Sequence, residues 1–338
     1  MKILVTGAGG YIGSVLVPML LEKGHFVRAV DRFFFGDTLK QNKKLTIIKE
    51  DCRNLDINFF NGIDAVIDLV AISNDPSGEK FKEETMDINW RSRVATAKFA
   101  KEAGVNRYIL PSSCSIYGFQ DKNFIADENT KTNPLTTYAI ANEKCEKEIL
   151  PLADENFCPV VLRQATVYGL SPRMRFDLAI NGMTYGAFQD GKLPLMRDGS
   201  QWRPMVHVRD TARAQVFMLD APKEKVSKQI FNVGSKDNVY QLQPLAEIVA
   251  DTVPRDVEII WYGDPDHRSY RVAFDKIEKL GFKSEKSAED GISEICRAIK
   301  ENGLKKTTET ITLDWYMHLE EIYKKVKELE INNKMLRL

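Results

Sequence analysis

The chain has 338 residues, with 48 lysine and arginine residues against 48 aspartate and glutamate residues, so its formal net charge is zero. This balance gives no global field that would favour nucleic acid or an anionic membrane surface. The hydrophobic content of 43% is ordinary for a globular protein, and no apolar run approaches the ~18 residues of a membrane helix.

The N-terminal sequence enters a strand pattern directly, which predicts that no signal peptide precedes the folded chain. The five cysteines show neither paired nor metal-ligand spacing: Cys52, Cys114, Cys145, Cys158 and Cys296. We therefore expect a cytoplasmic, reduced protein with no metal site, no membrane anchor and no nucleic-acid partner.

Short apolar runs rich in β-branched residues alternate with helical stretches through the first half of the chain. The apolar runs predict buried strands at 2–8, 26–32, 45–51, 65–71, 107–113 and 160–165. Helical periodicity is found at 11–23, 79–103 and 136–155. This alternation predicts right-handed crossovers and an α/β fold, a doubly wound parallel sheet of about seven strands with helices on both faces.

From about residue 170 the pattern is less regular. We expect a strand at 203–208, a helix at 209–220 and a seventh sheet strand at 229–234, which returns the chain to the sheet. The predicted units therefore interleave: residues 1–168 with strand 229–234, a smaller α/β domain at 169–306, and an amphipathic helix and tail at 307–338. The apolar residues of that helix favour a docking or dimer face over a membrane anchor.

The segment TGAGGYIG, residues 6–13, follows the first strand and opens the first helix. Its glycines, Gly7, Gly10 and Gly13, have the spacing that permits a tight turn, a close backbone approach to a pyrophosphate, and close packing of helix on strand. The free N–H groups and positive end of the helix then face the phosphates. A plain tight turn would also explain the glycines, but the strand and helix around them predict a dinucleotide site.

Two carboxylates end the second and third predicted strands. Asp31 stands 18 residues beyond Gly13, where a carboxylate binds the hydroxyls of an adenosine ribose and repels a 2′-phosphate. NAD is therefore favoured over NADP, although Arg32 beside it is able to tolerate a phosphate. Asp51 is placed either to reach the adenine amino group or to cap a helix.

The glycine spacing resembles that of the extended short-chain dehydrogenase/reductase superfamily, whose members include nucleotide-sugar epimerases, dehydratases and reductases. The resemblance continues through AVIDLVAIS (65–73), INWRSR (88–93), GVNRYILPSSCSIYG (104–118), LRQATVYGLSP (162–172), WRPMVHVRD (202–210) and FNVGS (231–235). It spans roughly residues 1–235 and resumes near 270–282. It implies a homodimer formed through the helices at 79–103 and 136–155, and a nucleoside-diphosphate sugar as the bound partner.

The resemblance also implies which residues bind NAD. They are Gly7, Gly10, Tyr11, Ile12, Gly13, Asp31, Arg32, Asp51, Cys52, Val70, Ala71, Asn89 and Tyr138.

In the family, a serine or threonine and the tyrosine of a Y-x-x-x-K motif act on the C4 hydroxyl of the sugar. The tyrosinate takes the hydroxyl proton while C4 gives a hydride to NAD⁺, and the lysine holds the nicotinamide ribose and lowers the tyrosine pKa. The matching residues are Ser113 and Tyr138. The alternatives are a serine that only caps a strand and a tyrosine that is only a half-buried helix residue.

Positions 114 and 115 divide the family by reaction. Dehydratases resemble T-D-E-x-Y, with an acid and a base for removing water, whereas this chain has Cys114 and Ser115. Neither a hydroxyl nor a neutral thiol is a comparable acid/base pair near neutral pH. Epimerases acting at C3 and C5 place a cysteine where Ser115 stands, so Cys114 is one residue off and is expected in the core. We expect C4 chemistry rather than 4,6-dehydration.

The lysine of the family motif is replaced by Asn142. Lys144 lies about 120° away from the required helix face, which makes it a poor substitute. Asn142 can donate a hydrogen bond to the ribose but brings no charge. The sequence therefore leaves two alternatives: a slow or reduction-favouring enzyme, in which neutral tyrosine is already the required acid, and a catalytically weak or inactive NAD-binding sensor or subunit.

At the substrate end, a diphosphate calls for arginines with bidentate geometry. Arg203 and Arg268 match the two arginines of the family, with Arg173, Arg175 and Arg271 as further candidates. The resemblance adds Ser113, Ser115 and Asn181 as substrate contacts. Each arginine could equally be a solvated surface charge, and neither the base nor the sugar is identified. The expectation is an NAD-dependent nucleotide-sugar epimerase or oxidoreductase that acts through a C4-keto intermediate.

Overall fold

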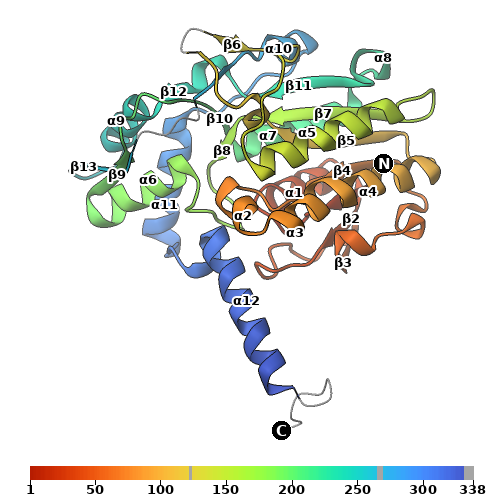
Figure 1. Cartoon of the computed structure of the whole chain (residues 1–338), viewed down its shortest axis with the longest axis horizontal. Coiled ribbons are helices and arrows are strands. Elements are labelled where there is room, and N and C mark those ends of the chain that lie inside the picture. The colour runs from red at the N-terminus through yellow and green to blue at the C-terminus, as the bar shows by residue number, and fades with distance from the viewer. Residues whose placement is uncertain (122–123, 265–268, 331–338) are drawn as a thin grey trace.

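The computed structural model describes residues 1–121, 124–264 and 269–330. A parallel sheet of seven strands lies at its centre, in the order β11-β7-β5-β4-β1-β2-β3 (Figure 1). The strands are β1 (Lys2–Thr6), β2 (Phe26–Asp31), β3 (Leu45–Lys49), β4 (Ala65–Asp68), β5 (Arg107–Ser113), β7 (Cys158–Gln164) and β11 (Gln229–Val233). The predicted doubly wound fold is confirmed, and β11 is the seventh strand of the sheet.

Both faces of the sheet are buried, since alternate residues of each strand enter different cores. On one face, Ile3 and Val5 pack with helices α1 (Gly13–Glu22) and α7 (Val208–Asp220). On the other face, Leu4 packs with α4 (Arg93–Glu102) and α5 (Thr137–Ile149). The strand segments are therefore almost continuously hydrophobic, as the sequence pattern predicted.

The remaining elements gather mostly beside the sheet, with α6, α9 and α11 at one end of the molecule in Figure 1. The strands here form small sheets: β8 (Thr166–Tyr168) with β10 (Trp202–His207) and β12 (Val239–Gln241), β9 (Lys192–Met196) with β13 (Glu258–Tyr262), and β6 (Ile125–Ala126) with β14 (Arg271–Val272). The helices are α6 (Ala179–Asp190), α8 (Lys223–Val226), α9 (Leu242–Thr252), α10 (Asp275–Leu280) and α11 (Ala288–Asn302).

The prediction of one long helix at 79–103 is wrong in detail. The structure divides this region into α2 (Asp75–Lys80), α3 (Lys82–Met86), a π-helical turn at 87–92, and α4. Asn74 caps α2 by accepting a hydrogen bond from the Ser77 N–H at 2.9 Å, so helical structure begins earlier than predicted. Phe81, with φ −119° and ψ 61°, then interrupts the helix.

The C-terminal helix α12 (Thr312–Leu329) docks at its first turns and then projects away from the body (Figure 1). Trp315 Nε1 donates a hydrogen bond to the carbonyl oxygen of Phe34 at 2.6 Å, and the Tyr316 ring contacts the rings of Phe34 and Phe35. Further along, the side chain of Tyr323 is 62% exposed. Within the described ranges, no helix has the length and apolar character needed to cross a bilayer.

Candidate active site

A cavity of about 920 Å³ lies at the carboxyl ends of the central strands. Its walls come from the glycine loop, the ends of β2, β4 and β5, the start of α5, and residues between 194 and 205. Ligands of open α/β sheets bind at this edge, where the strand order reverses between β1 and β4. The cavity therefore joins the predicted cofactor residues to the predicted chemical centre.

The glycine loop requires glycine at two positions. Gly7 has φ +63°, and a Cβ atom there would lie 2.7 Å from the backbone nitrogen of Val70. A Cβ atom at Gly13 would lie 2.4 Å from the carbonyl oxygen of Gly7. The loop thus lies against the chain just after β4, and the start of α1 packs on the loop itself; Gly10, Tyr11 and Ile12 also line the cavity. Backbone N–H groups at such a helix start suit a pyrophosphate.

Asp31 lines the cavity at the end of β2. Its Oδ2 accepts a hydrogen bond from the Gly9 N–H at 3.0 Å, and its Oδ1 accepts one from the Phe33 N–H at 2.6 Å. Burial raises the pKa of Asp31 above its ordinary value, although these N–H groups act in the opposite direction. Each carboxylate oxygen keeps acceptor capacity for a ribose hydroxyl.

Asp51 caps the short helix at 52–54 and forms ion pairs with Arg53 at 2.6 Å and Arg32 at 2.7 Å. Hydrogen bonding from Arg53, assisted by Arg32, holds the pKa of Asp51 well below its usual range. Arg32 also lies over the Phe34 ring, 4.6 Å from its centroid. The adjacent Cys52 lines the cavity, and burial raises its thiol pKa to about 12.

Arg173 is a buried cation at the cofactor end of the cavity. It donates a hydrogen bond to Thr312 Oγ1 at 3.0 Å and lies over the Phe35 ring at 3.7 Å, but its Nη1 has no hydrogen-bond partner among the described residues. Burial lowers the pKa of Arg173 to about 9, with the nearby Arg175 adding to this effect. A buried, incompletely paired guanidinium is suited to an anion. Together with the glycine loop and Asp31, Arg173 fits an adenosine dinucleotide.

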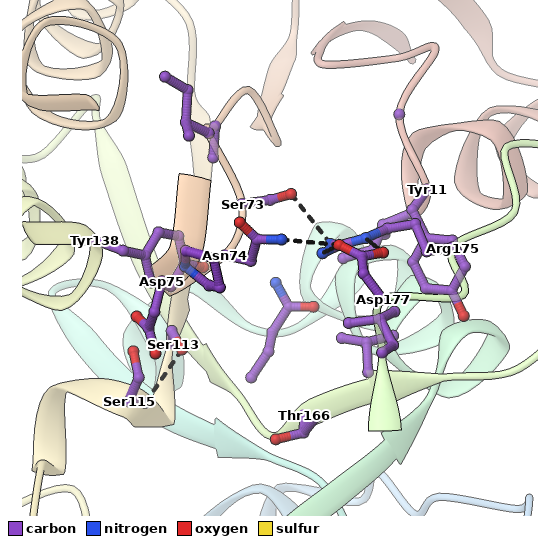
Figure 2. A pocket seen from close by; sticks show the side chains of 18 of the residues that line it. Tyr11, Ser73, Asn74, Asp75, Ser113, Ser115, Tyr138, Thr166, Arg175 and Asp177 are labelled. Atoms are coloured by element: carbon purple, nitrogen blue, oxygen red, sulfur yellow. Dashed lines mark hydrogen bonds and ion pairs between the residues drawn. The ribbon is translucent and has the colours of Figure 1, made fainter. Parts of the chain in front are cut away.

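The predicted chemical pair lies at the end of β5 and the start of α5. Ser113 Oγ accepts a hydrogen bond from the Ser115 N–H at 3.1 Å, which caps the short helix at 114–117. Figure 2 shows Ser113, Ser115 and Tyr138 on the same side of the cavity. Burial raises the pKa of Tyr138 above its ordinary value, whereas the charge of Arg93 and hydrogen bonding with Asn142 and Ser113 lower it.

Asn142 lies one helical turn after Tyr138 but does not line the cavity. Its Nδ2 donates a hydrogen bond to the Tyr138 carbonyl oxygen at 3.0 Å, and its Oδ1 accepts one from Arg93 Nη1 at 3.3 Å. The side chain is therefore engaged within the protein interior. Lys144 points elsewhere, with its Nζ 4.4 Å from the centroid of the Trp90 ring.

Helix α2 fixes the first turn of α5. Thr136 Oγ1 donates a hydrogen bond to Asp75 Oδ1, and the Thr137 N–H donates one to Glu79 Oε1, both at 2.7 Å. A Cβ atom at Gly78 would lie 3.3 Å from Tyr138 Cβ, so α2 and α5 approach closely here. Asp75 also lines the cavity, and its negative charge raises the pKa of Tyr138.

Asn89 and Asn181 are buried and do not line the cavity. The Asn89 amide accepts a hydrogen bond from the Ile72 N–H at 2.8 Å and donates one to the Ile72 carbonyl at 2.9 Å. The Asn181 amide accepts a hydrogen bond from the Gly169 N–H and donates one to Tyr11 Oη. Both asparagines thus hold loops: Asn89 supports the loop that carries Val70 and Ala71 into the cavity, and Asn181 supports Tyr11.

The part of the cavity away from the glycine loop contains several polar groups. Arg203 lines it, donates a hydrogen bond to the Trp202 carbonyl at 2.9 Å and lies over the Tyr270 ring. The buried Gln201 also lines it, and neither of its amide atoms has a hydrogen-bond partner in the described part of the chain. Ser115 Oγ is likewise buried without a hydrogen-bond partner among the described residues. Arg268 lies outside the described residues.

Hydrogen bonds and an ion pair join two segments of the cavity wall (Figure 2). Ser73 Oγ accepts a hydrogen bond from Arg175 at 3.1 Å, and Asn74 Nδ2 donates one to Asp177 Oδ2 at 2.8 Å. Arg175 and Asp177 are themselves ion-paired at 2.8 Å. The loop after β4 is thereby fastened to the segment after β8.

Comparison with known proteins identifies the family. The model of the NAD dependent epimerase/dehydratase family matches residues 3–234, which is more than half of the chain. The chain belongs to this family. NAD is accordingly its cofactor, in agreement with the fit of the glycine loop, Asp31 and Arg173.

Individual relatives match along most of their length. The uncharacterized UDP-glucose epimerase YtcB of Bacillus subtilis is 30% identical over 264 residues, covering 73% of this chain and 81% of that protein. The UDP-glucose 4-epimerase of Corynebacterium glutamicum is 28% identical over 287 residues, covering 78% of this chain and 85% of that protein. Among solved structures, MoeE5 in complex with UDP-glucuronic acid and NAD has a TM-score of 0.79 at 25% identity, covering 89% of this chain and 100% of that one.

Two cavity residues of this family member, Asp75 and Gln201, were not predicted as site residues from the sequence, and Arg173 was predicted only as a further candidate for the diphosphate. Asp75 and Gln201 stand in no motif with a recognisable ligand, and Arg173 is one of several arginines in an irregular segment. Only the fold shows that Asp75 approaches the start of α5 and that Arg173 and Gln201 keep unpaired polar atoms. The run SPRMR at 171–175 was the one available signal for Arg173.

Proposed function

We propose that this family member is an NAD-dependent nucleotide-sugar epimerase or oxidoreductase that acts through a C4-keto sugar. The observation that carries the proposal is the placement of Ser113 and Tyr138 in the same cavity as the glycine loop and Asp31. A sugar bound there would contact the serine and tyrosine hydroxyls while the cofactor occupies the glycine-loop end.

The bound NAD supplies hydride acceptance and return at the sugar C4. Tyr138 moves the matching proton: its Oη accepts the proton of the C4 hydroxyl in oxidation and returns it in reduction. Ser113, whose side chain hydrogen-bonds with that of Tyr138, orients the C4 hydroxyl of the sugar through its Oγ. The raised pKa of Tyr138 keeps its phenol protonated at neutral pH, so the form needed for reduction is fully populated and the tyrosinate needed for oxidation is scarce.

Residues 114 and 115 hold the acid and base in relatives that catalyse dehydration or C3/C5 epimerisation, and the residues found here favour C4 chemistry instead. Cys114 is buried, donates its S–H to the Arg163 carbonyl oxygen at 3.3 Å, and does not line the cavity. Burial raises the pKa of its thiol, which argues against a thiolate base. Ser115 at the next position offers a hydroxyl, which suits substrate binding better than removal of water.

The substrate that we propose is a nucleoside-diphosphate sugar, held mainly by the 169–306 unit while the 1–168 unit holds NAD. Arg203 provides a cation for the diphosphate, and Arg268 is proposed as a second one. Gln201 offers an amide donor and acceptor that would be satisfied by a polar ligand edge. Relatives named for UDP-glucose, and the MoeE5 complex with UDP-glucuronic acid, make UDP-sugars the first compounds to test.

A second candidate function is an NAD-binding sensor or subunit with weak or absent turnover. It is favoured by the neutral side chain of Asn142 and by the raised pKa of Tyr138. The two candidates share the cofactor site and differ only in chemistry at the sugar C4.

Mass spectrometry of ligands released from the purified protein, followed by incubation with a panel of nucleoside-diphosphate sugars and their 4-keto forms, separates these candidates. We expect released NAD and conversion of at least one sugar at C4. Firm NAD binding without turnover of any panel member would favour the sensor, and formation of a 4-keto-6-deoxy sugar, the product of water loss across C5–C6, would contradict the proposed reaction.

We also propose a homodimer formed through α4 and α5, whose outer surfaces include the 36% exposed side chain of Ile140. Sedimentation at micromolar concentration is expected to give twice the mass of one chain. Ile140→Glu is the matched test variant, because it would place a carboxylate in that contact. A monomer for the unmodified protein would contradict the proposal.

A further inference from the structure

Arg93, the first residue of α4, is a buried cation directly behind the proposed chemical centre. Its side chain is about 2% exposed. Its guanidinium donates hydrogen bonds to the carbonyl oxygens of Asp68 at 2.6 Å and Pro111 at 2.7 Å, to Asn142 Oδ1 at 3.3 Å, and to Asp68 Oδ2 at 3.3 Å. Three of these four acceptors are neutral.

The one acidic partner is only partly available to Arg93. The Asp68 carboxylate also accepts hydrogen bonds from Thr6 and from Tyr108 Oη, the latter at 2.6 Å to the same Oδ2 atom. Although burial opposes the charge, Asp68 raises the pKa of Arg93, so the guanidinium stays protonated. The Arg93 guanidinium is therefore a permanent cation in the interior, and its Nη1–H group is directed at Asn142 on α5.

Asn142 connects this cation to the tyrosine. Its Oδ1 binds Arg93, and its Nδ2 binds the backbone of Tyr138 one turn earlier on α5. A lysine at 142 would have to share this space with the guanidinium, and two adjacent cations in a buried site repel each other. The neutral amide at 142 and the cation at 93 are thus compatible with one another.

We propose that Arg93 supplies, from α4, the positive charge that the family motif places on α5, with Asn142 as the positioning residue that keeps the guanidinium beside Tyr138. This inference rests on the proposed role of Tyr138 in proton transfer. Arg93 does not line the cavity, so it acts through Tyr138 and is a positioning residue rather than a catalytic one.

The surrounding charges are consistent with this role. Tyr138 faces Arg93, which lowers its pKa, and Asp75 of α2, which raises it. Around Arg93, burial raises the pKa of Cys145 to about 12 and holds that of Tyr108 well above its ordinary value, so both remain neutral. Asp68 is the acidic side chain that pairs with Arg93, at 3.3 Å.

The test measures the ionisation of Tyr138 itself, with no substrate present. The NAD-bound protein is prepared with ring-¹³C tyrosine, the Tyr138 signal is assigned by its absence in Tyr138→Phe, and its chemical shift is followed through the alkaline range. Removing only Arg93 would leave a buried carboxylate unpaired. The comparison is therefore made between Asp68→Asn and Asp68→Asn/Arg93→Met, which differ only at position 93.

We expect Asp68→Asn to lower the pKa of Tyr138, because Arg93 loses its counter-charge. Adding Arg93→Met is expected to raise that pKa by about one unit or more, a tenfold loss of tyrosinate at a given pH. Adding Asn142→Lys to this double variant is expected to lower the pKa again. Arg93→Lys in the unmodified protein keeps the cation and is expected to leave the pKa close to its starting value.

A Tyr138 pKa that does not respond to Arg93→Met in the Asp68→Asn background, in a protein that still binds NAD, would overturn the inference. Because this measurement needs no turnover, a failure of the proposed nucleotide-sugar reaction would appear separately in the substrate panel. A merely structural role for Arg93 predicts losses of stability but no opposite shifts in the two variants.

Discussion

The two ends of the cavity are built in different ways. At the cofactor end, Gly7, Gly13 and Asp31 are placed by a single strand–loop–helix unit and its neighbouring strand. At the chemical end, Tyr138 receives its surroundings from Asp75 on α2 and Arg93 on α4, in addition to β5. Apart from Arg173, the cofactor end thus depends on local geometry, whereas the surroundings of the tyrosine depend on long-range packing.

The largest expected effect separates these ends directly. Tyr138→Phe removes the proposed proton-transfer group, and we expect turnover at the sugar C4 to fall by about 10²–10⁴-fold in both directions. NAD affinity is expected to change little, since the glycine loop and Asp31 are untouched. Steady-state rates and NAD titration measure the two properties, with the exposed Tyr323→Phe as the matched control. Full activity in Tyr138→Phe would remove Tyr138 from the mechanism.

The second variant reverses that pattern. Arg173→Met removes the incompletely paired guanidinium at the cofactor end, and we expect NAD binding to weaken by about 1.5–3 kcal/mol, the scale of hydrogen bonds to a charged group. Nucleoside-diphosphate binding, assigned to Arg203, is expected to remain. Calorimetry with NAD and with UDP makes the comparison, and the exposed Arg209→Met is the matched control. Unchanged NAD affinity would show that Arg173 faces no phosphate.

Sequence reasoning succeeded where structure follows from neighbouring residues. The continuous apolar run at Ile3, Leu4 and Val5, which are all buried in cores on the two faces of the sheet, and the glycine spacing made the parallel sheet and its binding edge predictable. It was less accurate for 79–103, because the helix is interrupted at Phe81, a residue type that does not mark a helix break in the sequence.

The candidate site shows the same division. Ser113 and Tyr138 stood in recognisable motifs, and the structure brings them into one cavity. Asn142 was identified from the sequence as a replacement of the family's lysine. The structural role of its side chain depends on Arg93, 49 residues earlier in the chain. Arg93 gave no signal by itself, since an arginine in a helix is normally a solvated charge. Its burial becomes visible only once β4, β5 and α5 are assembled around it.

A smaller effect concerns cofactor choice. Asp31 lines the cofactor end of the cavity, where we expect it to face the ribose, and Arg32 is paired with Asp51 rather than free to neutralise a 2′-phosphate. We expect NAD to bind at least about tenfold more tightly than NADP, a difference of about 1.4 kcal/mol. Asp31→Asn is expected to narrow the difference mainly by improving NADP binding. Fluorescence titration with both reduced cofactors tests this, and equal affinities in the unmodified protein would contradict the role given to Asp31.

The smallest expected effect is the response of the chemical end to pH. Burial raises the pKa of Tyr138, so the tyrosinate is scarce at neutral pH even though Arg93 acts in the opposite direction. Oxidation of a C4 hydroxyl needs the tyrosinate, and its rate is therefore expected to rise with pH until Tyr138 ionises. Reduction of a 4-keto sugar needs the neutral phenol, which is fully present at neutral pH, and is expected to fall only at alkaline pH.

Asn142→Lys sharpens this last prediction, because it adds a second cation beside the one already supplied by Arg93. If Arg93 performs most of the task, the added lysine has little left to contribute and incurs repulsion from the guanidinium. We therefore expect the oxidation profile to move to lower pH by less than about one unit, a gain of only a few-fold at neutral pH. Rate against pH in both directions, for the unmodified protein and Asn142→Lys, provides the measurement. A shift of several units would mean that Tyr138 had lacked an effective cation, and the chemical end would then depend on its own helix as locally as the cofactor end depends on its glycine loop.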